Sequence, residues 1–304
     1  MTSITTLEER ARGCLLGLAA GDAVGTTVEF KPPGTFDPVV DMTGGGIFQL
    51  EAGQWTDDTS MALCLGYSLV KRGGFDAHDQ MNRYLRWYRE GYMSVNGRCF
   101  DIGNTCRGAI EQFESEGDPL CGDPSSGAAG NGSIMRLAPV VLFYAESPDL
   151  LKHCALSSKT THGTEAAVRA CEVLGLVIQA ALRGREKAAV LEAAAGLPGL
   201  PGALRHIADG RYMNKNPGEI EGQGYVVKSL EAALWCFWKT QTFEDAILTA
   251  ANLGHDADTT AAVCGQVAGA YYGVGGIPEK WLALLAWRDE IEELADRCLK
   301  GGGR

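Results

Sequence analysis

The spacing of the apolar residues constrains this chain most. They recur every three or four positions, as in Met61, Leu65 and Leu69. Such spacing places them on one face of a helix, whereas a half-buried strand alternates apolar and polar residues. The short runs 39–40 and 139–141 resemble strands, but they have no hairpin turns or regular βαβ rhythm beside them. The sequence therefore predicts an all-α fold.

We expect about a dozen helices, joined by glycine- and proline-rich connections. The predicted helical ranges are 7–20, 58–71, 76–89, 105–116, 133–145, 149–157, 163–183, 186–195, 228–239, 243–252, 258–272 and 279–298. None of the connections has the low complexity of a flexible interdomain linker. One compact domain over residues 1–304 is therefore expected, with a frayed tail at 301–304.

Charge and composition exclude several classes of protein. The chain has 27 Lys and Arg against 38 Asp and Glu, a net charge of −11, which argues against a nucleic acid partner. Its ten cysteines form no CxxC pair, so neither a zinc ribbon nor a secreted disulfide framework is indicated, and we expect a cytoplasmic protein. No segment has the length and apolarity of a membrane span or the basic start of a signal peptide. No membrane partner is expected.

The first concentrated chemical signal is Thr56-Asp57-Asp58-Thr59, directly before an apolar helix. Two adjacent carboxylates repel each other unless a cation lies between them. The alternative is helix capping, in which Thr56 is the N-cap and each acid in the first turn contributes ~0.3–1 kcal/mol. This segment alone does not separate the two interpretations.

The second signal is Asp256-Ala257-Asp258-Thr259, again at the start of an apolar helix. Capping explains one of its acids, but it does not explain why two segments about 200 residues apart both present two acids and a threonine there. Carboxylate and hydroxyl oxygens suit hard cations such as Mg²⁺, Ca²⁺ or Mn²⁺. We therefore predict a two-cation site held by Thr56, Asp57, Asp58, Asp256, Asp258 and Thr259.

Three further segments become candidates once a metal site is accepted. Glu29 lies in a turn after the first helix, where the alternative is a solvated acid. Asp101 precedes the Gly103-Asn104 turn at a helix start, where simple N-capping is the alternative. The small residues Gly130-Asn131-Gly132-Ser133 would let backbone N–H groups approach a diphosphate, although the spacing matches no established phosphate loop.

His162 and Tyr225 are weaker candidates for binding substrate. His162 lies at a helix start, where a structural histidine is the alternative. Tyr225 follows glycines that leave its surroundings bare. His255 adjoins the second acid segment, but imidazole suits a hard oxygen site poorly, so we do not predict it as a ligand.

Taken together, these segments resemble the ADP-ribosylglycohydrolase family, whose bacterial type is the dinitrogenase reductase-activating glycohydrolase. The resemblance covers nearly the whole chain. The matching pieces are Gly21-Asp22-Ala23-Val24-Gly25 with Glu29, Trp55 to Thr59, Asp101 to Thr105, Gly130 to Arg136, Thr161-His162-Gly163, Gly224 to Val227, and Asp256 to Thr259. His255 departs from the pattern, because many members have glycine at this position.

The resemblance implies a single domain of orthogonal helices with two Mg²⁺ or Mn²⁺ ions. Their ligands would be Thr56, Asp57, Asp58, Asp256, Asp258 and Thr259, the residues reached above from their spacing. It assigns substrate handling to residues 130–133, to the Gly103-Asn104 turn, and to His162 and Tyr225. Glu29 and Asp101 would be the acids near the scissile bond, with Asp101 our first choice for acid–base catalysis.

The implied activity is metal-dependent removal of ADP-ribose from protein side chains. The pieces at 101–105 and 224–227 look closest to members that act on modified arginine, so we expect cleavage of the N-glycosidic bond of ADP-ribosyl-arginine. The implied partners are an ADP-ribosylated protein and the product ADP-ribose, and we expect a monomer. The alternatives are a hydrolase of another ADP-ribose linkage (serine, nucleobase or O-acetyl-ADP-ribose) and a non-catalytic ADP-ribose-binding protein on the same scaffold.

Overall fold

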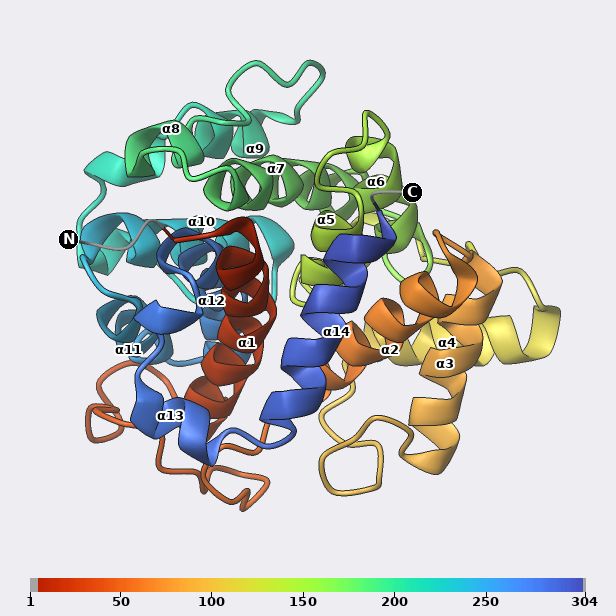
Figure 1. The fold of residues 1–304 in the computed structure, drawn as a ribbon, viewed down its shortest axis with the longest axis horizontal. Helices are drawn as coiled ribbons and strands as arrows, with labels where there is room; N and C mark the ends of the chain where they lie inside the picture. Colours follow the sequence, from red (N-terminus) through yellow and green to blue (C-terminus); the bar gives the residue numbers. More distant parts are fainter. Residues whose placement is uncertain (1–4, 303–304) are drawn as a thin grey trace.

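The computed structural model describes residues 5–302, and α-helices dominate them (Figure 1). The α-helices are α1 (Leu7–Gly25), α2 (Asp57–Arg72), α3 (Ala77–Glu90), α4 (Asn104–Glu116), α5 (Ala138–Phe143), α6 (Leu150–Lys159), α7 (Glu165–Leu182), α8 (Lys187–Leu191), α9 (Gly202–Ala208), α10 (Val226–Lys239), α11 (Phe243–Ala251), α12 (Ala257–Tyr272), α13 (Glu279–Leu284) and α14 (Arg288–Gly301). The short 3-10 helices are η1 (Thr26–Val28), η2 (Ser126–Ala128), η3 (Arg211–Asn214), η4 (Pro217–Glu219) and η5 (Val274–Gly276). Pairing between extended segments is limited, within residues 5–302, to isolated bridges. The all-α prediction is confirmed.

Helices α1 and α12 pack at the centre of the fold with their backbones in direct contact. Glycines recur every fourth residue along α1, and a Cβ at Gly13 or Gly17 would overlap the carbonyl oxygen of Gly269 or Gly265, respectively. Farther along α1, a Cβ at Gly21 would overlap the Ala261 carbonyl. Because no side chains separate the two helices, the C-terminal end of α1 lies against the N-terminus of α12.

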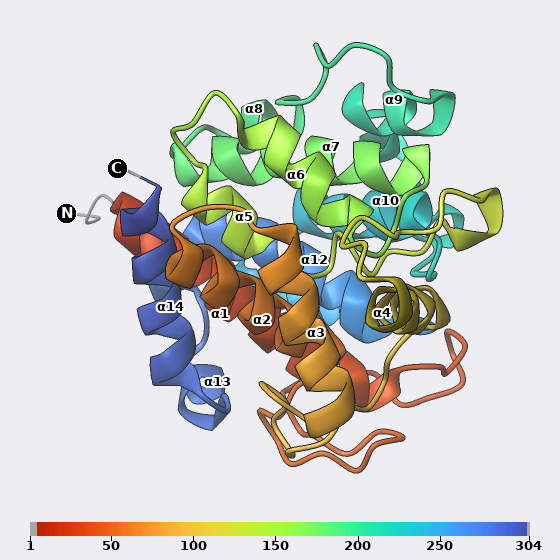
Figure 2. The same ribbon diagram turned by 90° about the vertical axis from the view of Figure 1, so that its right-hand side faces the viewer.

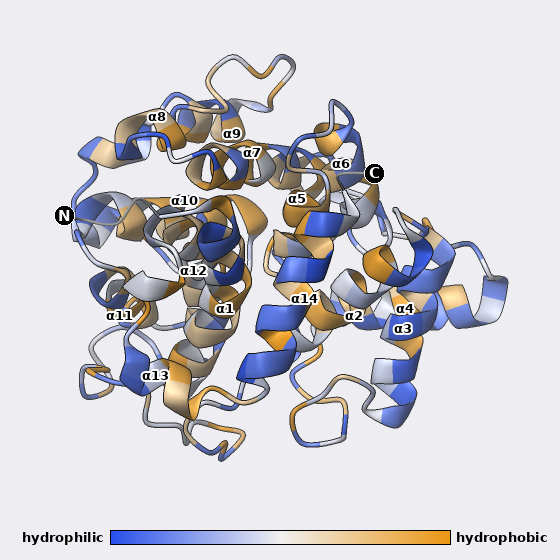
Figure 3. Cartoon of the chain, viewed as in Figure 1, coloured by the Kyte–Doolittle hydropathy of each residue, from blue (hydrophilic) through white to orange (hydrophobic). Residues whose placement is uncertain are grey.

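The other helices surround this central pair. Helix α14 packs on α1 and α2, while α7 and α10 contact α12 (Figures 1 and 2). The visible face of α14 is hydrophilic in Figure 3, whereas its buried face consists of Ile291, Leu294, Ala295 and Cys298. A continuous cluster of buried apolar residues extends from Ala11 to Cys298. This shared cluster supports the single domain, which stays a prediction.

Several helix boundaries differ from the prediction. The range 133–145 is not one helix, because α5 begins only at Ala138 and places Pro139 in its first turn, where no N–H is needed. The range 279–298 divides into α13 and α14, since Trp287 adopts a left-handed backbone (φ 58°) and the preceding Ala286 donates its N–H to the Gly53 carbonyl (3.0 Å). Helix α9 falls in a connection for which no helix was predicted.

Neither strand-like run forms a strand, and the expected tail begins within a helix. Residues 140–141 lie in α5, and 39–40 are irregular. Helix α14 continues to Gly301, one residue into the expected tail, while residues 303–304 lie outside the described part of the chain. Among residues 5–302, no helix is both long and apolar enough to cross a membrane.

Candidate active site

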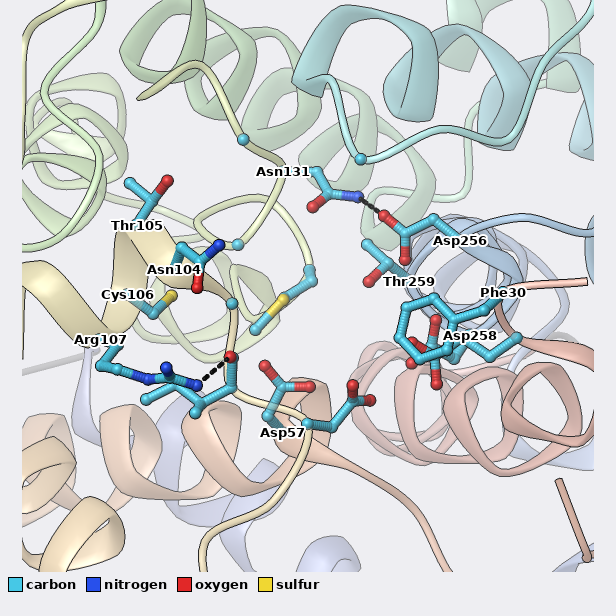
Figure 4. Close-up of a pocket in the computed structure, with 18 of the residues that line it drawn as sticks. Phe30, Asp57, Asn104, Thr105, Cys106, Arg107, Asn131, Asp256, Asp258 and Thr259 are labelled. Carbon is cyan, nitrogen blue, oxygen red and sulfur yellow. Dashed lines mark hydrogen bonds between the residues drawn. The ribbon is translucent and has the colours of Figure 1, made fainter. Parts of the chain in front are cut away.

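A cleft of about 960 Å³ opens where several loops and helix N-termini meet (Figure 4). Acids from the starts of α2 and α12 line it, together with the loop at 29–30, the segment 99–107 and the turn at 130–132. In Figure 4, Asp57, Asp256, Asp258 and Thr259 point into this space, with Asn104 and Thr105 across from Asp256. The two acid segments therefore converge on one cleft, as the sequence predicted.

The contacts between these segments do not support simple helix capping. Neither Thr56 nor Asp256, the N-cap residues of α2 and α12, makes a side-chain capping hydrogen bond. Instead the two segments contact each other: Thr259 Oγ1 donates to Asp58 Oδ1 (3.2 Å), and Thr56 Oγ1 lies 3.4 Å from an oxygen of Asp258. The polar side chains are therefore directed toward the cleft between the helices.

Asp22, in the last turns of α1, holds the start of α2 in place. One of its carboxylate oxygens accepts the backbone N–H and the hydroxyl of Thr56, each at 2.8 Å. The other oxygen accepts the N–H (3.0 Å) and the hydroxyl (2.6 Å) of Thr59. Burial raises the pKa of Asp22 to about 6, against the effect of these hydrogen bonds. This role was not predicted, although Asp22 belongs to one of the pieces that carry the family resemblance, because its partners lie 34 and 37 residues away in the chain.

Glu29 and Asp101 form a second group of acids at the mouth of the cleft. Carboxylate oxygens of Glu29, Asp101 and Asp258 all lie within 4.8 Å of one another. Two residues of this region have left-handed backbones, Asp101 (φ 60°) and Phe30 (φ 62°). Backbone hydrogen bonds from Phe30 N–H to the His255 carbonyl (2.6 Å) and from His255 N–H to the Lys31 carbonyl (2.8 Å) join the Glu29 loop to the start of α12.

His255 departs from the pattern described above, in which glycine is expected, and its backbone conformation gives the physical reason for that glycine. Its backbone is also left-handed (φ 55°), a conformation that glycine adopts without steric cost. Its carbonyl and N–H are both used to hold the loop that carries Glu29. His255 therefore contributes its backbone conformation to the site.

The acids of the cleft are buried close together, and this arrangement favours a bound cation. Burial, followed by repulsion from neighbouring acids, raises the pKa of Asp57, Asp58, Asp258 and Glu29 above the ordinary range, and that of Asp101 to about 10. One buried oxygen each of Glu29, Asp58, Asp101 and Asp258 has no hydrogen-bond partner among the described residues. Unpaired buried carboxylate oxygens are unfavourable unless a proton or a cation is bound. The residues present thus fit hard divalent metal ions.

The glycine-rich turn forms the wall above the acids. Asn131 Nδ2 donates to Asp256 Oδ2 (2.7 Å), and its backbone N–H donates to the Gly224 carbonyl (3.0 Å). A Cβ added at Gly132 would lie 2.8 Å from the His162 ring, and one at Gly130 would lie 3.2 Å from its Nε2. Glycine is therefore needed here so that the chain can pass directly over the imidazole.

His162 is a neutral side chain on the floor of this turn. Burial, and then the Arg136 guanidinium, lowers the pKa of His162 to about 3. Thr161 Oγ1 accepts from Arg136 (2.6 Å) and lies 2.8 Å from His162 Nδ1, so its proton is directed at Nδ1. We infer that the ring proton is on Nε2 and can be donated toward the cleft.

Two of the predicted substrate residues do not line the cleft. Ser133 is buried behind the turn, where its hydroxyl accepts from Ser158 Oγ (3.0 Å). The Tyr225 side chain is 46% exposed outside the cleft; the segment instead contributes Gln223 and Gly224 to the lining. The glycines before Tyr225 pack closely against the start of α12: a Cβ at Gly222 would lie 3.0 Å from Thr260 Oγ1, and one at Gly224 would lie 3.3 Å from Asp256 Oδ2. Gly103, Asn104, Gly130, Asn131, Gly132 and His162 do line the cleft.

Other lining residues were not predicted. Phe48 and Phe100 contribute aromatic rings, and Arg107 is the one Lys or Arg among the described residues of the lining. They come from irregular segments or from an exposed helix face, where no sequence pattern distinguished them.

Comparison with known proteins gives a consistent result. A family model described as ADP-ribosylglycohydrolase matches residues 3–304. The chain is 48% identical over 288 residues to "ADP-ribosylarginine hydrolase Tri1" of Pseudomonas putida (strain GB-1), covering 94% of this chain and 77% of that protein. It is 35% identical to "ADP-ribosyl-[dinitrogen reductase] glycohydrolase" of Rhodospirillum rubrum, covering 94% of both. A solved "ADP-ribosylglycohydrolase-related protein complex" superposes with a TM-score of 0.88 at 46% identity, over 98% of this chain and 100% of that one.

Proposed function

The chain belongs to the ADP-ribosylglycohydrolase family, and we propose that this enzyme hydrolyses the N-glycosidic bond of ADP-ribosyl-arginine in modified proteins. The observation that carries the proposal is the convergence of two acid segments with Glu29 and Asp101 in one cleft. The arginine linkage is supported by the similarity to the Pseudomonas and Serratia proteins named as ADP-ribosylarginine hydrolases, at 48% and 45% identity.

We further propose that the acids of α2 and α12 hold two Mg²⁺ or Mn²⁺ ions. The ligands would be the side chains of Thr56, Asp57, Asp58, Asp256, Asp258 and Thr259. Bound ions of this kind supply charge stabilisation, orient hydroxyl ligands and lower the pKa of a bound water. The unpaired buried oxygens of Asp58 and Asp258 support this assignment.

Different residues of the cleft would then transfer the proton, orient the water and bind the diphosphate. Hydrolysis forms a bond between water and the anomeric carbon, breaks the bond from that carbon to the guanidino nitrogen, and transfers a proton to this nitrogen. In this proposal Asp101 carries the proton, and Glu29, whose carboxylate lies close to that of Asp101, orients the water or the leaving group. The backbone of residues 130–132 and the N–H that we assign to His162 Nε2 would hold the diphosphate.

A comparison of substrates tests this proposal. The metal-loaded enzyme is incubated with ADP-ribosyl-arginine, ADP-ribosyl-serine, O-acetyl-ADP-ribose and ADP-ribosylated DNA, each with Mg²⁺, with Mn²⁺ or with EDTA, and release of ADP-ribose is measured. We expect the fastest release from arginine and none in EDTA. Faster turnover of another linkage would replace arginine as the substrate, and binding of ADP-ribose without any turnover would indicate a non-catalytic protein.

Variants separate the metal-binding and acid–base roles. Asp57→Ala or Asp258→Ala should abolish release and weaken Mg²⁺ binding while the helical far-UV signal is retained. Asp101→Asn should lower the single-turnover rate ~10²–10⁴-fold with Mg²⁺ binding largely retained. An unchanged rate in Asp101→Asn, together with a loss in Glu29→Gln, would transfer the acid–base role to Glu29.

We also propose a cytoplasmic location and a monomeric enzyme. All ten cysteines are unpaired and nine of them are buried, which suits a reducing compartment. The cleft as described is built from one chain alone.

A further inference from the structure

Three phenylalanines of this chain do not belong to the hydrophobic core. The sequence has nine, all within residues 5–302, and six of them belong to the core cluster or pack against it. The other three, Phe30, Phe48 and Phe100, all line the cleft. Phe30 is 59% exposed. Large apolar rings left partly exposed at a polar cleft are unfavourable in the free protein, which suggests that they contact a ligand.

The three rings line the same cleft as the two acids Glu29 and Asp101. Phe30 directly follows Glu29, and Phe100 directly precedes Asp101. Phe48 extends the same surface, because its ring meets the Phe100 ring edge to face at 5.2 Å. In Figure 4, Phe30 is on the same side of the cleft as Asp256 and Asp258. The mouth of the cleft therefore combines carboxylates with aromatic rings.

We infer that Phe30, Phe48 and Phe100 form the subsite for the guanidinium group of the modified arginine. This inference rests on the proposed function. A guanidinium is planar and positively charged, so its edge pairs with carboxylates while its faces stack on aromatic rings. Its nitrogen is bonded to the anomeric carbon, so it must lie beside the acid that transfers the proton. Asp101 occupies that position, with Phe100 next to it.

Adenine, the other planar group of the substrate, suits this subsite less well. It is separated from the scissile bond by the distal ribose, the diphosphate and the second ribose, so it cannot lie beside Asp101 while that bond is being cleaved. It is also uncharged, so it lacks the charge attraction that a guanidinium has to the carboxylates of Glu29 and Asp101. Charge complementarity therefore favours the arginine side chain as the occupant.

The most informative variants change Phe48, which lies farthest in the sequence from the acids and the metal-binding segments. Phe48→Leu keeps most of the bulk but removes the aromatic face, and Phe48→Tyr keeps the face. Tyr88→Leu is a matched control. The Arg89 guanidinium carbon lies 4.5 Å from the centre of the Tyr88 ring on α3, so this cation–π contact lies outside the cleft. Thermal unfolding of each metal-loaded variant would show that the fold is retained.

Two constants separate the arginine end of the substrate from the rest. One is KM for ADP-ribosyl-arginine, and the other is the dissociation constant of ADP-ribose, which has no arginine, measured by calorimetry in Mg²⁺. We expect Phe48→Leu to raise KM about 3- to 30-fold and to change ADP-ribose binding less than about 2-fold, as for a cation–π contact. Phe48→Tyr should have the KM of the wild-type enzyme, and Tyr88→Leu should alter neither constant.

An unchanged KM in Phe48→Leu would overturn the subsite while leaving the proposed function intact. An equal loss of ADP-ribose binding would also overturn it, since the ring would then contact the ribose or the adenine. If the wild-type enzyme does not cleave ADP-ribosyl-arginine, the proposed function fails together with the subsite. That result is seen before any variant is made.

Discussion

Replacing Asp22 with asparagine tests whether the metal-binding segments are held in place from α1. The Asp22 carboxylate accepts two backbone N–H groups and two hydroxyls from Thr56 and Thr59, at 2.6 to 3.0 Å. Asparagine offers one oxygen in place of two, and its NH₂ group would face the donors on the other side. One buried backbone N–H then loses its acceptor, which costs ~1–3 kcal/mol.

The substitution also removes a buried charge. Its effect on stability should therefore differ between the metal-free and the metal-bound protein. Since burial raises the pKa of Asp22 to about 6, its ionised form is less favourable in the metal-free folded protein than in the unfolded chain. Removing that charge offsets the lost hydrogen bonds, so the free energy of unfolding in EDTA should change little. With the cations bound, the displaced Thr56 and Thr59 no longer align the ligands. Loss of such a supporting contact typically weakens metal binding ~10–100-fold.

The two measurements are calorimetric titration of Mg²⁺ and thermal unfolding in EDTA and in Mg²⁺. A 10–100-fold loss of affinity corresponds to ~1.4–2.7 kcal/mol, so Asp22→Asn should be destabilising by about that much more in saturating Mg²⁺ than in EDTA. Asp37→Asn, at an exposed position, is the control for loss of one negative charge. Unchanged Mg²⁺ affinity would refute the role that we assign to Asp22.

Three further predictions concern pH, packing and backbone strain. Because burial and neighbouring acids raise the pKa of Asp258, and that of Asp101 to about 10, the metal-free folded protein binds more protons than the unfolded chain above pH ~4. Its melting temperature in EDTA should therefore fall as the pH rises from 5.5 to 8.5, while the stabilisation by Mg²⁺ should grow; a melting temperature that rises with pH in EDTA would contradict this. Gly17→Ala should lower the free energy of unfolding by ~1–3 kcal/mol, because the methyl group overlaps the backbone of α12. Gly108→Ala, on an open face of α4, should raise it by up to ~1 kcal/mol, and equal effects at the two glycines in urea unfolding would refute the packing argument. His255→Gly should relieve the left-handed backbone and gain ~0.5–1 kcal/mol in the same assay, whereas a clear loss would show that the imidazole itself is needed.

Sequence reasoning succeeded where the signal was local. Helical spacing of apolar residues identified most helices, because each buries one face against the shared core. The two acid segments were recognised because each packs its acids into a few residues directly before an apolar helix. Their convergence followed from the mutual repulsion of the acids, which only a shared cation would relieve.

Sequence reasoning failed where the partners are distant in the chain. Asp22 belongs to a piece that carries the family resemblance, but its hydrogen bonds join it to residues 34 and 37 positions away, so its local sequence gives no sign of this role. Phe48 and Phe100 come from irregular segments that meet only in the folded protein. Tyr225 lies outside the cleft lining, and the glycines before it pack against the start of α12, contacts that no local pattern showed.

The backbone contact between α1 and α12 also restricts how this family can change in length. Each glycine of α1 faces one small residue of α12, so the register of the two helices is fixed over the whole contact. Inserting one residue into α1 would rotate everything beyond it by ~100°, moving Asp22 away from the start of α2. Insertions and deletions among relatives should therefore be confined to loops such as 31–54 and 196–201, which lie outside the paired helices.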